Sequence, residues 1–289
     1  MGGSSPVGHA EWGATWVDWQ AGVGCDGREN LTSPPGGGCG HCEPRMQIDE
    51  YRKLAETEDR MWYFRALHRR RSHWLARLLP AGPARVLDAG CGTGGFIRSL
   101  RAARPDWTVT GVDLSPVACG LARERTGVEI IEGSLTALPF DDGTFEAVTT
   151  GDVLYHIQDT AAVLREMARC VKPGGVVLVN EPAYRWLWSY HDVAVESKHR
   201  FTRAELVALF RSAGLEVVFA SYANMLVLPL VVARRKLFPP TRPTSDVQVY
   251  PAPIEAIFSA LTSLEYAWTK RGWPLPAGSS VFIAGVKRG

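Results

Sequence analysis

Long apolar runs are missing from this 289-residue sequence, although 46% of its residues are hydrophobic. The longest run, residues 225–233, is interrupted by Pro229 and falls well short of the roughly 20 residues that a membrane-spanning helix needs. The first residues also lack the basic and then apolar order of a secretory signal. We therefore expect a cytoplasmic protein without stable membrane insertion.

An excess of charge of one sign is also missing. The chain has 32 Lys and Arg residues against 30 Asp and Glu residues, which gives a formal net charge of +2. Binding to a phosphate backbone depends on basic side chains, so this balance gives no support for a nucleic-acid ligand. The chain also lacks an Asn-Pro-Pro-aromatic element of the type that serves a flipped base. We expect no nucleic-acid partner.

Cysteine pairs with metal-binding spacing are scarce. Three of the six cysteines, Cys25, Cys39 and Cys42, lie in a head rich in Gly, Ser and Pro. Two thiolates at Cys39 and Cys42 could hold one zinc ion, but a second matched pair is missing. We expect no metal site, and we interpret residues 1–45 as a disordered N-terminal extension, so that Met46 could be the natural start.

A helical cap is predicted over residues 46–83. Strong helix formers and an aromatic cluster at 62–64 lead into apolar residues at helical spacing, which predicts a helix from 47 to 79 that the prolines after it end. The segment also carries seven basic side chains, which form either a solvated basic face or a clamp for a phosphate or carboxylate of the substrate. They are Arg65, His68, Arg69, Arg70, Arg71, His73 and Arg77.

Strand and helix patterns then alternate through a core at 84–221, and a C-terminal segment at 222–289 adds a helix and a last strand. Strict alternation predicts an α/β fold with a parallel sheet and helices on both faces. Thr202 and Glu205 form a capping box that begins one of these helices. The expected strands are 85–89, 107–112, 128–131, 145–150, 176–180, 215–220 and 280–286; the expected helices include 96–103, 115–125, 160–171 and 253–270.

Residues 90–95 satisfy the Gly-x-Gly-x-x-Gly pattern of dinucleotide-binding loops, so a nicotinamide-dependent oxidoreductase is one candidate. Asp88 precedes the loop by two residues, where its negative charge would lie close to a bound pyrophosphate. A carboxylate there suits a cationic ligand, such as the ammonium and sulfonium end of S-adenosylmethionine. Asp113, at the end of the second strand, is placed to accept both ribose hydroxyls and fits either ligand.

Between about residues 86 and 220 the sequence resembles the class I S-adenosylmethionine-dependent methyltransferases of small-molecule type. The segment at 86–94 looks like the first motif of that family, and 111–115 like its ribose-binding strand end. Three further segments, at 132–140, 145–156 and 164–175, resemble its later motifs in the same order. The resemblance implies a Rossmann-like, seven-stranded, mostly parallel sheet in the order 3-2-1-4-5-7-6, with an antiparallel last strand.

The resemblance also implies S-adenosylmethionine as cofactor and S-adenosylhomocysteine as product. Ser134 departs from the family, which usually has Asp at this position to accept from the adenine amino group. A serine can still accept a hydrogen bond, though without charge, so the backbone of Ser134 and Leu135 and packing from Leu114 would hold the adenine. The expected cofactor-binding residues are Asp88, Gly90, Cys91, Gly92, Gly94, Asp113, Leu114, Ser134, Leu135 and Asp152.

Candidates for a catalytic base follow the fourth and fifth strands. A base is needed if the acceptor is a hydroxyl or an acidic carbon, because its proton must leave during methyl transfer. His156 is the first choice, since the intrinsic pKa of histidine suits this task, although a histidine here often only packs beside the cofactor. Tyr155 and His191 are the other candidates. The aromatic segment at 184–190 forms either an acceptor lid or packing under the helix that begins after Thr202.

The expected function is methyl transfer to a small, apolar or aromatic-containing metabolite. Two alternatives stay open: a nicotinamide-dependent oxidoreductase, and a cofactor-binding protein without transferase activity. The oligomeric state is not predicted. The apolar run at 225–233, with the basic residues 234–236 after it, fits docking on a membrane or an apolar acceptor, but we favour a plain core helix with a solvated basic end.

Overall fold

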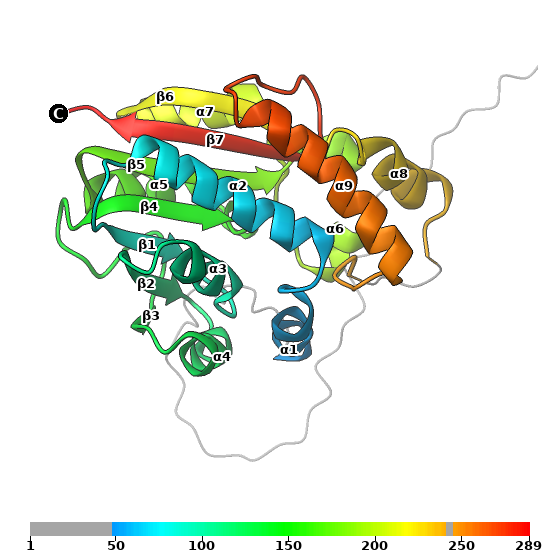
Figure 1. The fold of residues 1–289 in the computed structure, drawn as a ribbon, viewed down its shortest axis with the longest axis horizontal. Coiled ribbons are helices and arrows are strands. Elements are labelled where there is room, and N and C mark those ends of the chain that lie inside the picture. Colours follow the sequence, from blue (N-terminus) through cyan, green and yellow to red (C-terminus); the bar gives the residue numbers. More distant parts are fainter. Residues whose placement is uncertain (1–47, 241–244) are drawn as a thin grey trace, which may run out of the picture. The chain divides into compact units, whose positions relative to one another are not determined.

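One sheet of seven strands forms the centre of the fold in the residues that the computed structural model describes, 48–240 and 245–289 (Figure 1). The spatial order is β3-β2-β1-β4-β5-β7-β6, as the family resemblance implies. The strands are β1 (Arg85–Ala89), β2 (Thr108–Asp113), β3 (Ile130–Glu132), β4 (Phe145–Gly151), β5 (Val171–Pro182), β6 (Leu215–Ala223) and β7 (Ser280–Lys287).

Parallel pairing joins β1 to β2 and β4, β2 to β3, and β4 to β5. The last strand, β7, runs antiparallel between β5 and β6, so the expected Rossmann-like fold class is confirmed. Asp88 of β1 lies beside Gly111 of β2 and Thr149 of β4 in the register. The carboxyl ends of these strands therefore meet at one edge of the sheet, where α/β folds bind their ligands.

Helices cover both faces of the sheet. Successive strand residues belong to two hydrophobic clusters: Leu87 packs with residues of α5 and α7, whereas Val86 packs with residues of α2, α3 and α4. The helices are α1 (Ile48–Thr57), α2 (Trp62–Leu78), α3 (Gly95–Ala103), α4 (Pro116–Thr126), α5 (Thr160–Cys170), α6 (Tyr190–Ala194), α7 (Arg203–Ser212), α8 (Leu228–Val232) and α9 (Ala252–Thr269). Further helical turns are η1 (Leu154–His156), η2 (Arg185–Leu187) and η3 (Ala233–Leu237).

The single helix predicted from 47 to 79 is wrong, because the chain breaks between α1 and α2. Met61 is extended at the break, and the backbone N–H of Trp62 donates to Glu255 Oε2 at 2.7 Å. The partner of this first N–H of α2 therefore comes from α9, 193 residues further along the chain. No local pattern in the sequence reveals such a cap.

Helices α2 and α9 lie side by side and run in the same direction (Figure 1). Trp62 is bonded to Glu255, Arg69 to Thr262 and Arg77 to the backbone of Lys270, a constant offset along both helices. The cap, core and C-terminal segments predicted at 46–83, 84–221 and 222–289 thus lie in one compact unit, Glu43–Gly289. The predicted extension at 1–45, including Cys25, Cys39 and Cys42, lies outside the described residues.

The core-helix interpretation of residues 225–233 is wrong. Helix α8 occupies only Leu228–Val232, and none of its residues is buried. Val227, just before it, is the residue that packs inside. Over the described part of the chain, no helix has the length and hydropathy required to cross a bilayer.

Candidate active site

The glycine-rich loop joins β1 to α3 at the ligand-binding edge of the sheet. Gly90, Gly92 and Gly94 all have left-handed backbone angles, with φ values of 76°, 53° and 85°. A Cβ atom at Gly90 would lie 2.5 Å from Cγ2 of Val153, closer than real side-chain contacts allow. The loop therefore depends on glycine for its shape, and it leaves the backbone open to close approach by a ligand.

Asp113 ends β2 opposite this loop. Its Oδ2 accepts the N–H of Gly92 at 2.8 Å, and its Oδ1 accepts the N–H of Ser115 at 3.0 Å. The carboxylate is thus held at the position expected for ribose recognition, and burial raises its pKa above the ordinary value. Burial and the charge of Asp113 raise the pKa of Tyr51, in α1, to about 12.

Asp88 forms a buried ion pair that the sequence analysis missed. Arg71 of α2 donates from Nη2 to Asp88 Oδ1 at 2.5 Å and from Nε to Thr149 Oγ1 at 3.0 Å. Its guanidinium also lies 3.6 Å from the ring centroid of Phe96. This pair corrects the sequence argument: Arg71 already balances the negative charge of Asp88, so Asp88 does not by itself select a cationic ligand.

Asp152 follows β4 and has a left-handed backbone angle, with φ of 58°. It accepts the hydroxyl of Tyr63 at 2.7 Å and the side-chain amide of Asn180 at 3.1 Å. Arg70 in turn donates to the Asn180 oxygen at 3.3 Å. Tyr63 and Arg70 both belong to α2, so this helix reaches the ends of β4 and β5, and the aromatic cluster at 62–64 was the one sequence signal for it.

The remaining predicted cofactor residues surround the same edge. Leu114 is exposed after β2 and Leu135 is buried, while the Ser134 hydroxyl bonds that of Thr136 at 2.8 Å. Cys91 is buried, and burial raises the pKa of its thiol well above the ordinary range. Cys91 therefore stays protonated and contributes its backbone to the loop.

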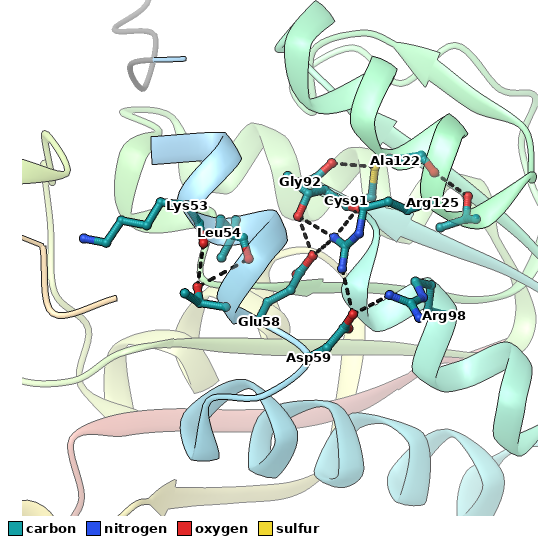
Figure 2. Close-up of polar contacts among 12 residues, drawn as sticks. Lys53, Leu54, Glu58, Asp59, Cys91, Gly92, Arg98, Ala122 and Arg125 are labelled. Atoms are coloured by element: carbon teal, nitrogen blue, oxygen red, sulfur yellow. Dashed lines mark hydrogen bonds and ion pairs between the residues drawn. The ribbon is translucent and has the colours of Figure 1, made fainter. Parts of the chain in front are cut away.

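A cluster of charged residues ties the α1–α2 junction to the glycine-rich loop, as Figure 2 shows. Glu58 accepts from the Thr93 hydroxyl and from Arg125, which also donates to the Thr93 backbone oxygen at 2.8 Å. Asp59 accepts from Arg125 at 2.9 Å and from Arg98. This junction cluster links the cap to the loop through Thr93, although its members are far apart in the sequence.

The basic side chains of α2 do not form a solvated face throughout. Arg71 and His68 are buried, and burial lowers the pKa of His68 to about 3. Arg69 donates to α9 from a half-buried position. The solvated-face interpretation is therefore wrong for Arg71, His68 and Arg69, because tertiary packing uses them between helices and at the sheet. Arg77, which donates to the backbone of Lys270 just after α9, is exposed.

Glu181 shapes the segment that carries two of the candidate bases. Its carboxylate accepts backbone N–H groups of Val153, Leu154 and Tyr155 at 3.2, 3.0 and 3.1 Å. Burial raises the pKa of Glu181 to about 8. The segment after Asp152 thus curls around one buried acid from β5, which fixes the direction of η1.

His156 lies at the end of η1 as a neutral imidazole. Its ring centroid is 3.9 Å from that of Tyr155, and it forms a hydrogen bond with the backbone of Glu196. Burial lowers the pKa of His156 to about 4. The pKa of Tyr155 is raised well above 10 by burial and the charge of Asp152, so at neutral pH His156 is the better proton acceptor of the two.

His191 forms its hydrogen bond with the segment around Asp246, not at η1. Its Nδ1 accepts the backbone N–H of Asp246 at 3.0 Å, and burial lowers its pKa to about 4. A neutral imidazole has one acceptor nitrogen, so this bond leaves the proton on Nε2. The neighbouring Tyr190 hydroxyl also donates to Asp246 at 2.7 Å. These contacts hold α6 to the segment around Asp246 and favour His156 over His191 as a base.

The aromatic segment at 184–190 packs in part on the sheet. Tyr184 stacks on Tyr222 of β6 with ring centroids 4.8 Å apart, and Leu187 is buried. Trp186, by contrast, is exposed, and its ring stacks on that of Tyr184. The segment therefore combines packing against β6 with one exposed aromatic side chain.

A family model described as a methyltransferase domain matches residues 61–219, more than half of the chain. The chain belongs to this methyltransferase family. The expectation drawn from the five sequence motifs is thereby confirmed, and with it S-adenosylmethionine as the cofactor of the family. The match covers α2, the glycine-rich loop and Asp113, and it ends within β6.

Curated relatives include two enzymes named demethylmenaquinone methyltransferase. The one from Roseiflexus castenholzii is 39% identical over 116 residues, covering 39% of this chain and 49% of the relative. The one from Bacillus licheniformis is 41% identical over 120 residues, covering 40% and 51%. The chain thus spans about half the length of the curated relatives it matches.

Solved structures show the same fold at lower identity. A Haloferax volcanii methyltransferase in complex with its Trm112 activator has a TM-score of 0.57 at 23% identity, covering 84% of this chain and 94% of that one. Geranyl diphosphate C-methyltransferase from Streptomyces coelicolor, solved with Mg²⁺, geranyl diphosphate and S-adenosylhomocysteine, has a TM-score of 0.54 at 20% identity, covering 85% and 86%. Both likenesses concern the fold.

Proposed function

We propose that this protein transfers a methyl group from S-adenosylmethionine to a small, apolar or aromatic-containing acceptor. One observation supports this above the others: Asp113, at the end of β2, has both carboxylate oxygens fixed by N–H groups of Gly92 and Ser115. The geometry suits recognition of two neighbouring ribose hydroxyls beside a loop that lacks side chains.

In this proposal Arg71 binds the carboxylate of the cofactor's amino acid end. Thr149 and Asp88 hold its Nε and Nη2, and its Nη1 lies 3.2 Å from the position that a Cβ would take on Gly151. Asp88 orients the guanidinium, and in this proposal it also faces the ammonium group of the cofactor. Leu114, Ser134 and Leu135 contact the adenine, as the sequence predicts.

When bound, S-adenosylmethionine supplies a methyl carbon made electrophilic by the sulfonium. The protein's task is to align the acceptor atom with the carbon–sulfur bond and to receive the acceptor proton where there is one. We assign the proton to the free nitrogen of His156. Since burial lowers its pKa to about 4, His156 is unprotonated at neutral pH and can accept this proton.

The two rival functions make different predictions. A nicotinamide-dependent enzyme would be stabilised against heat by nicotinamide dinucleotides and not by S-adenosylhomocysteine, which a thermal-shift comparison measures directly. A protein that binds the cofactor without transferring the methyl group would respond to S-adenosylhomocysteine but would show no turnover. Membership of the methyltransferase family favours the proposal over the first rival.

Asp113→Ala should weaken S-adenosylhomocysteine binding by about 1.5–3 kcal/mol, the range for hydrogen bonds to a charged group. Titration calorimetry measures the affinity, with Asp106→Ala as the matched control, because Asp106 is exposed and pairs only with Arg104 among the described residues. Equal affinities for Asp113→Ala and the unchanged protein would show that the ribose lies elsewhere.

The names of the curated relatives, demethylmenaquinone methyltransferase, support the proposed acceptor class. For this chain we propose an apolar, aromatic-containing acceptor and a cytoplasmic location. Mass spectrometry after incubation with methyl-labelled cofactor should detect label on an aromatic, apolar compound. Label only on water-soluble amines would contradict this assignment.

A further inference from the structure

Helix α9 has its polar side buried and its apolar side exposed, the reverse of a usual surface helix. Glu255, Thr262, Glu265 and Thr269 form its buried side. Its exposed residues from Ala252 to Trp268 are all apolar: the large ones are Ile254, Ile257, Leu264 and Trp268, and the rest are alanines and a proline. A surface helix of a globular protein normally presents charged and polar residues outward. The outer side of α9 therefore lacks the partner that such a surface requires.

Buried carboxylates hold α9 in this orientation. Glu255 accepts backbone N–H groups of Trp62 at 2.7 Å and Tyr250 at 3.0 Å. Glu265 accepts those of Asn224 at 2.8 Å and Leu226 at 2.7 Å. Rotating the helix would leave two carboxylates and four backbone groups without these bonds. The apolar outer side is consequently a fixed feature of the fold.

The apolar surface extends beyond α9. Val231 of α8 packs in the same cluster as Phe258 and Leu261 of α9, so the two helices are neighbours. Four exposed apolar side chains come from the chain around α8 and η3, and one follows α9. They are Leu226, Leu230, Leu237, Phe238 and Trp273. We call this surface, together with the outer side of α9, the apolar face.

Exposed apolar side chains are more frequent on this face than on the rest of the described surface. Thirteen large hydrophobic side chains are exposed in the described part of the chain, and nine of them lie between residues 226 and 273. Scattered apolar residues are normal on soluble proteins, but this concentration in one segment of the chain points to an interaction site.

Every exposed charge that the structure describes within residues 226–273 is positive. These are Arg234 and Lys236 in η3 and Lys270 and Arg271 after α9. The three acids of the same segment, Asp246, Glu255 and Glu265, all accept hydrogen bonds within the protein. Among its described residues, the segment 226–273 thus gives the apolar face a cationic rim and no exposed acid, the pattern that binds anionic lipid interfaces.

Aromatic side chains at the rim fit the same partner. Trp268 and Trp273 contact each other with ring centroids 4.6 Å apart, and Lys270 and Arg271 lie between them in the chain. Tryptophan is enriched at membrane interfaces, because its ring is apolar and its N–H is polar, and neighbouring cations contact lipid phosphates. A second copy of the chain fits less well, since two such faces would bring like charges together with no acid to pair them.

We propose that the apolar face docks on the surface of an anionic lipid bilayer. This goes beyond the proposed function and adds a route for its acceptor. Glu255, at the start of α9, binds Trp62, whose neighbour Tyr63 bonds Asp152 at the candidate active site. The start of α9 is thus linked to the site through α2, and in this proposal an apolar acceptor reaches the ends of β4 and β5 from the lipid.

Vesicle flotation with the full-length protein tests the proposal. The protein should float with vesicles of phosphatidylglycerol and much less with vesicles of phosphatidylcholine, and salt should weaken the binding. Leu264→Gln with Trp268→Gln should reduce the bound fraction about tenfold or more, through the lost burial of two large apolar side chains. Lys270→Gln with Arg271→Gln should reduce it about fivefold per cation.

Val218→Gln is the matched control, because Val218 is an exposed apolar residue on β6, away from the apolar face. It should float like the unchanged protein. Circular dichroism and S-adenosylhomocysteine calorimetry check that each variant is folded. If Leu264→Gln with Trp268→Gln does not fold, Lys270→Gln with Arg271→Gln still tests lipid binding. Flotation does not depend on turnover, so the two proposals can fail separately.

Two results would overturn the proposal. If the face variants float as well as the unchanged protein, another surface binds lipid. If the protein does not float and light scattering shows a dimer that Leu264→Gln with Trp268→Gln converts to a monomer, the apolar face is an interface between two copies of the chain.

Discussion

Replacing His156 with alanine is expected to lower turnover by roughly 10²–10⁴-fold while S-adenosylhomocysteine affinity stays near that of the unchanged protein, the loss typical of a general base. The expectation rests on a half-buried, neutral imidazole at the end of η1, oriented by Tyr155 and the backbone of Glu196. Steady-state kinetics with the identified acceptor, together with calorimetry, measures both quantities.

The pH dependence of turnover follows from the lowered pKa. With a pKa of about 4, shifted down by burial and by nearby Lys198, His156 is unprotonated above about pH 5. The rising limb assigned to this base should therefore lie near pH 4, not near the ordinary value of about 6.5. Between pH 5 and 8 this group should leave turnover unchanged.

His199→Ala is the matched control for His156, since His199 is a half-exposed histidine that pairs with Glu205 at the start of α7. It should leave turnover unchanged. If His156→Ala lowers affinity and turnover together, His156 shapes the pocket, and Tyr155 becomes the better candidate. If neither falls, the acceptor needs no base, and catalysis depends on alignment alone.

Arg71→Met should lower the free energy of unfolding by about 3–5 kcal/mol, because it leaves the carboxylate of Asp88 buried without its partner. Arg71 and Asp88 have side-chain exposures of only 4% and 2%, so water cannot replace the lost contact. Urea denaturation measures the change. The same variant should weaken cofactor binding, as Arg71 is the proposed partner of the cofactor carboxylate.

A double variant separates the charge effect from simple loss of packing. Arg71→Met with Asp88→Asn should recover much of the lost stability, because the unpaired charge is then removed. Arg288→Met is the control: its pair with Glu216 is exposed, and exposed pairs contribute about 0–1 kcal/mol. Equal losses for Arg71→Met and Arg288→Met would contradict an important role for the buried pair.

Much of the sheet and the nucleotide end of the site could be predicted because their signals are local. Strand β1 was predicted with the bounds it has, Arg85–Ala89, because a short apolar segment directly before a glycine-rich loop is typical of a strand. The capping box at Thr202 and Glu205 is present, with both of its reciprocal bonds. Such patterns depend on residues within one turn or one strand, which the sequence displays directly.

Partners that are distant in the chain could not be predicted in this way. The sequence placed Asp88 beside the loop but did not reveal Arg71, and it offered His191 as a base without showing its bond to Asp246. Each side chain has many chemically suitable partners in a chain of this length. Only packing of α2, α6 and the C-terminal segment against the sheet selects among them.

The sequence by itself determined the alternation of strands and helices, the glycines of the loop and the carboxylate at the end of β2, because periodicity, turn geometry and spacing are local properties. The tertiary structure alone decided where the chain breaks between α1 and α2, which charge balances Asp88, and which side of α9 faces outward. The reason is the same in each case: a buried charge or backbone group must find a partner, and its position depends on how distant elements pack.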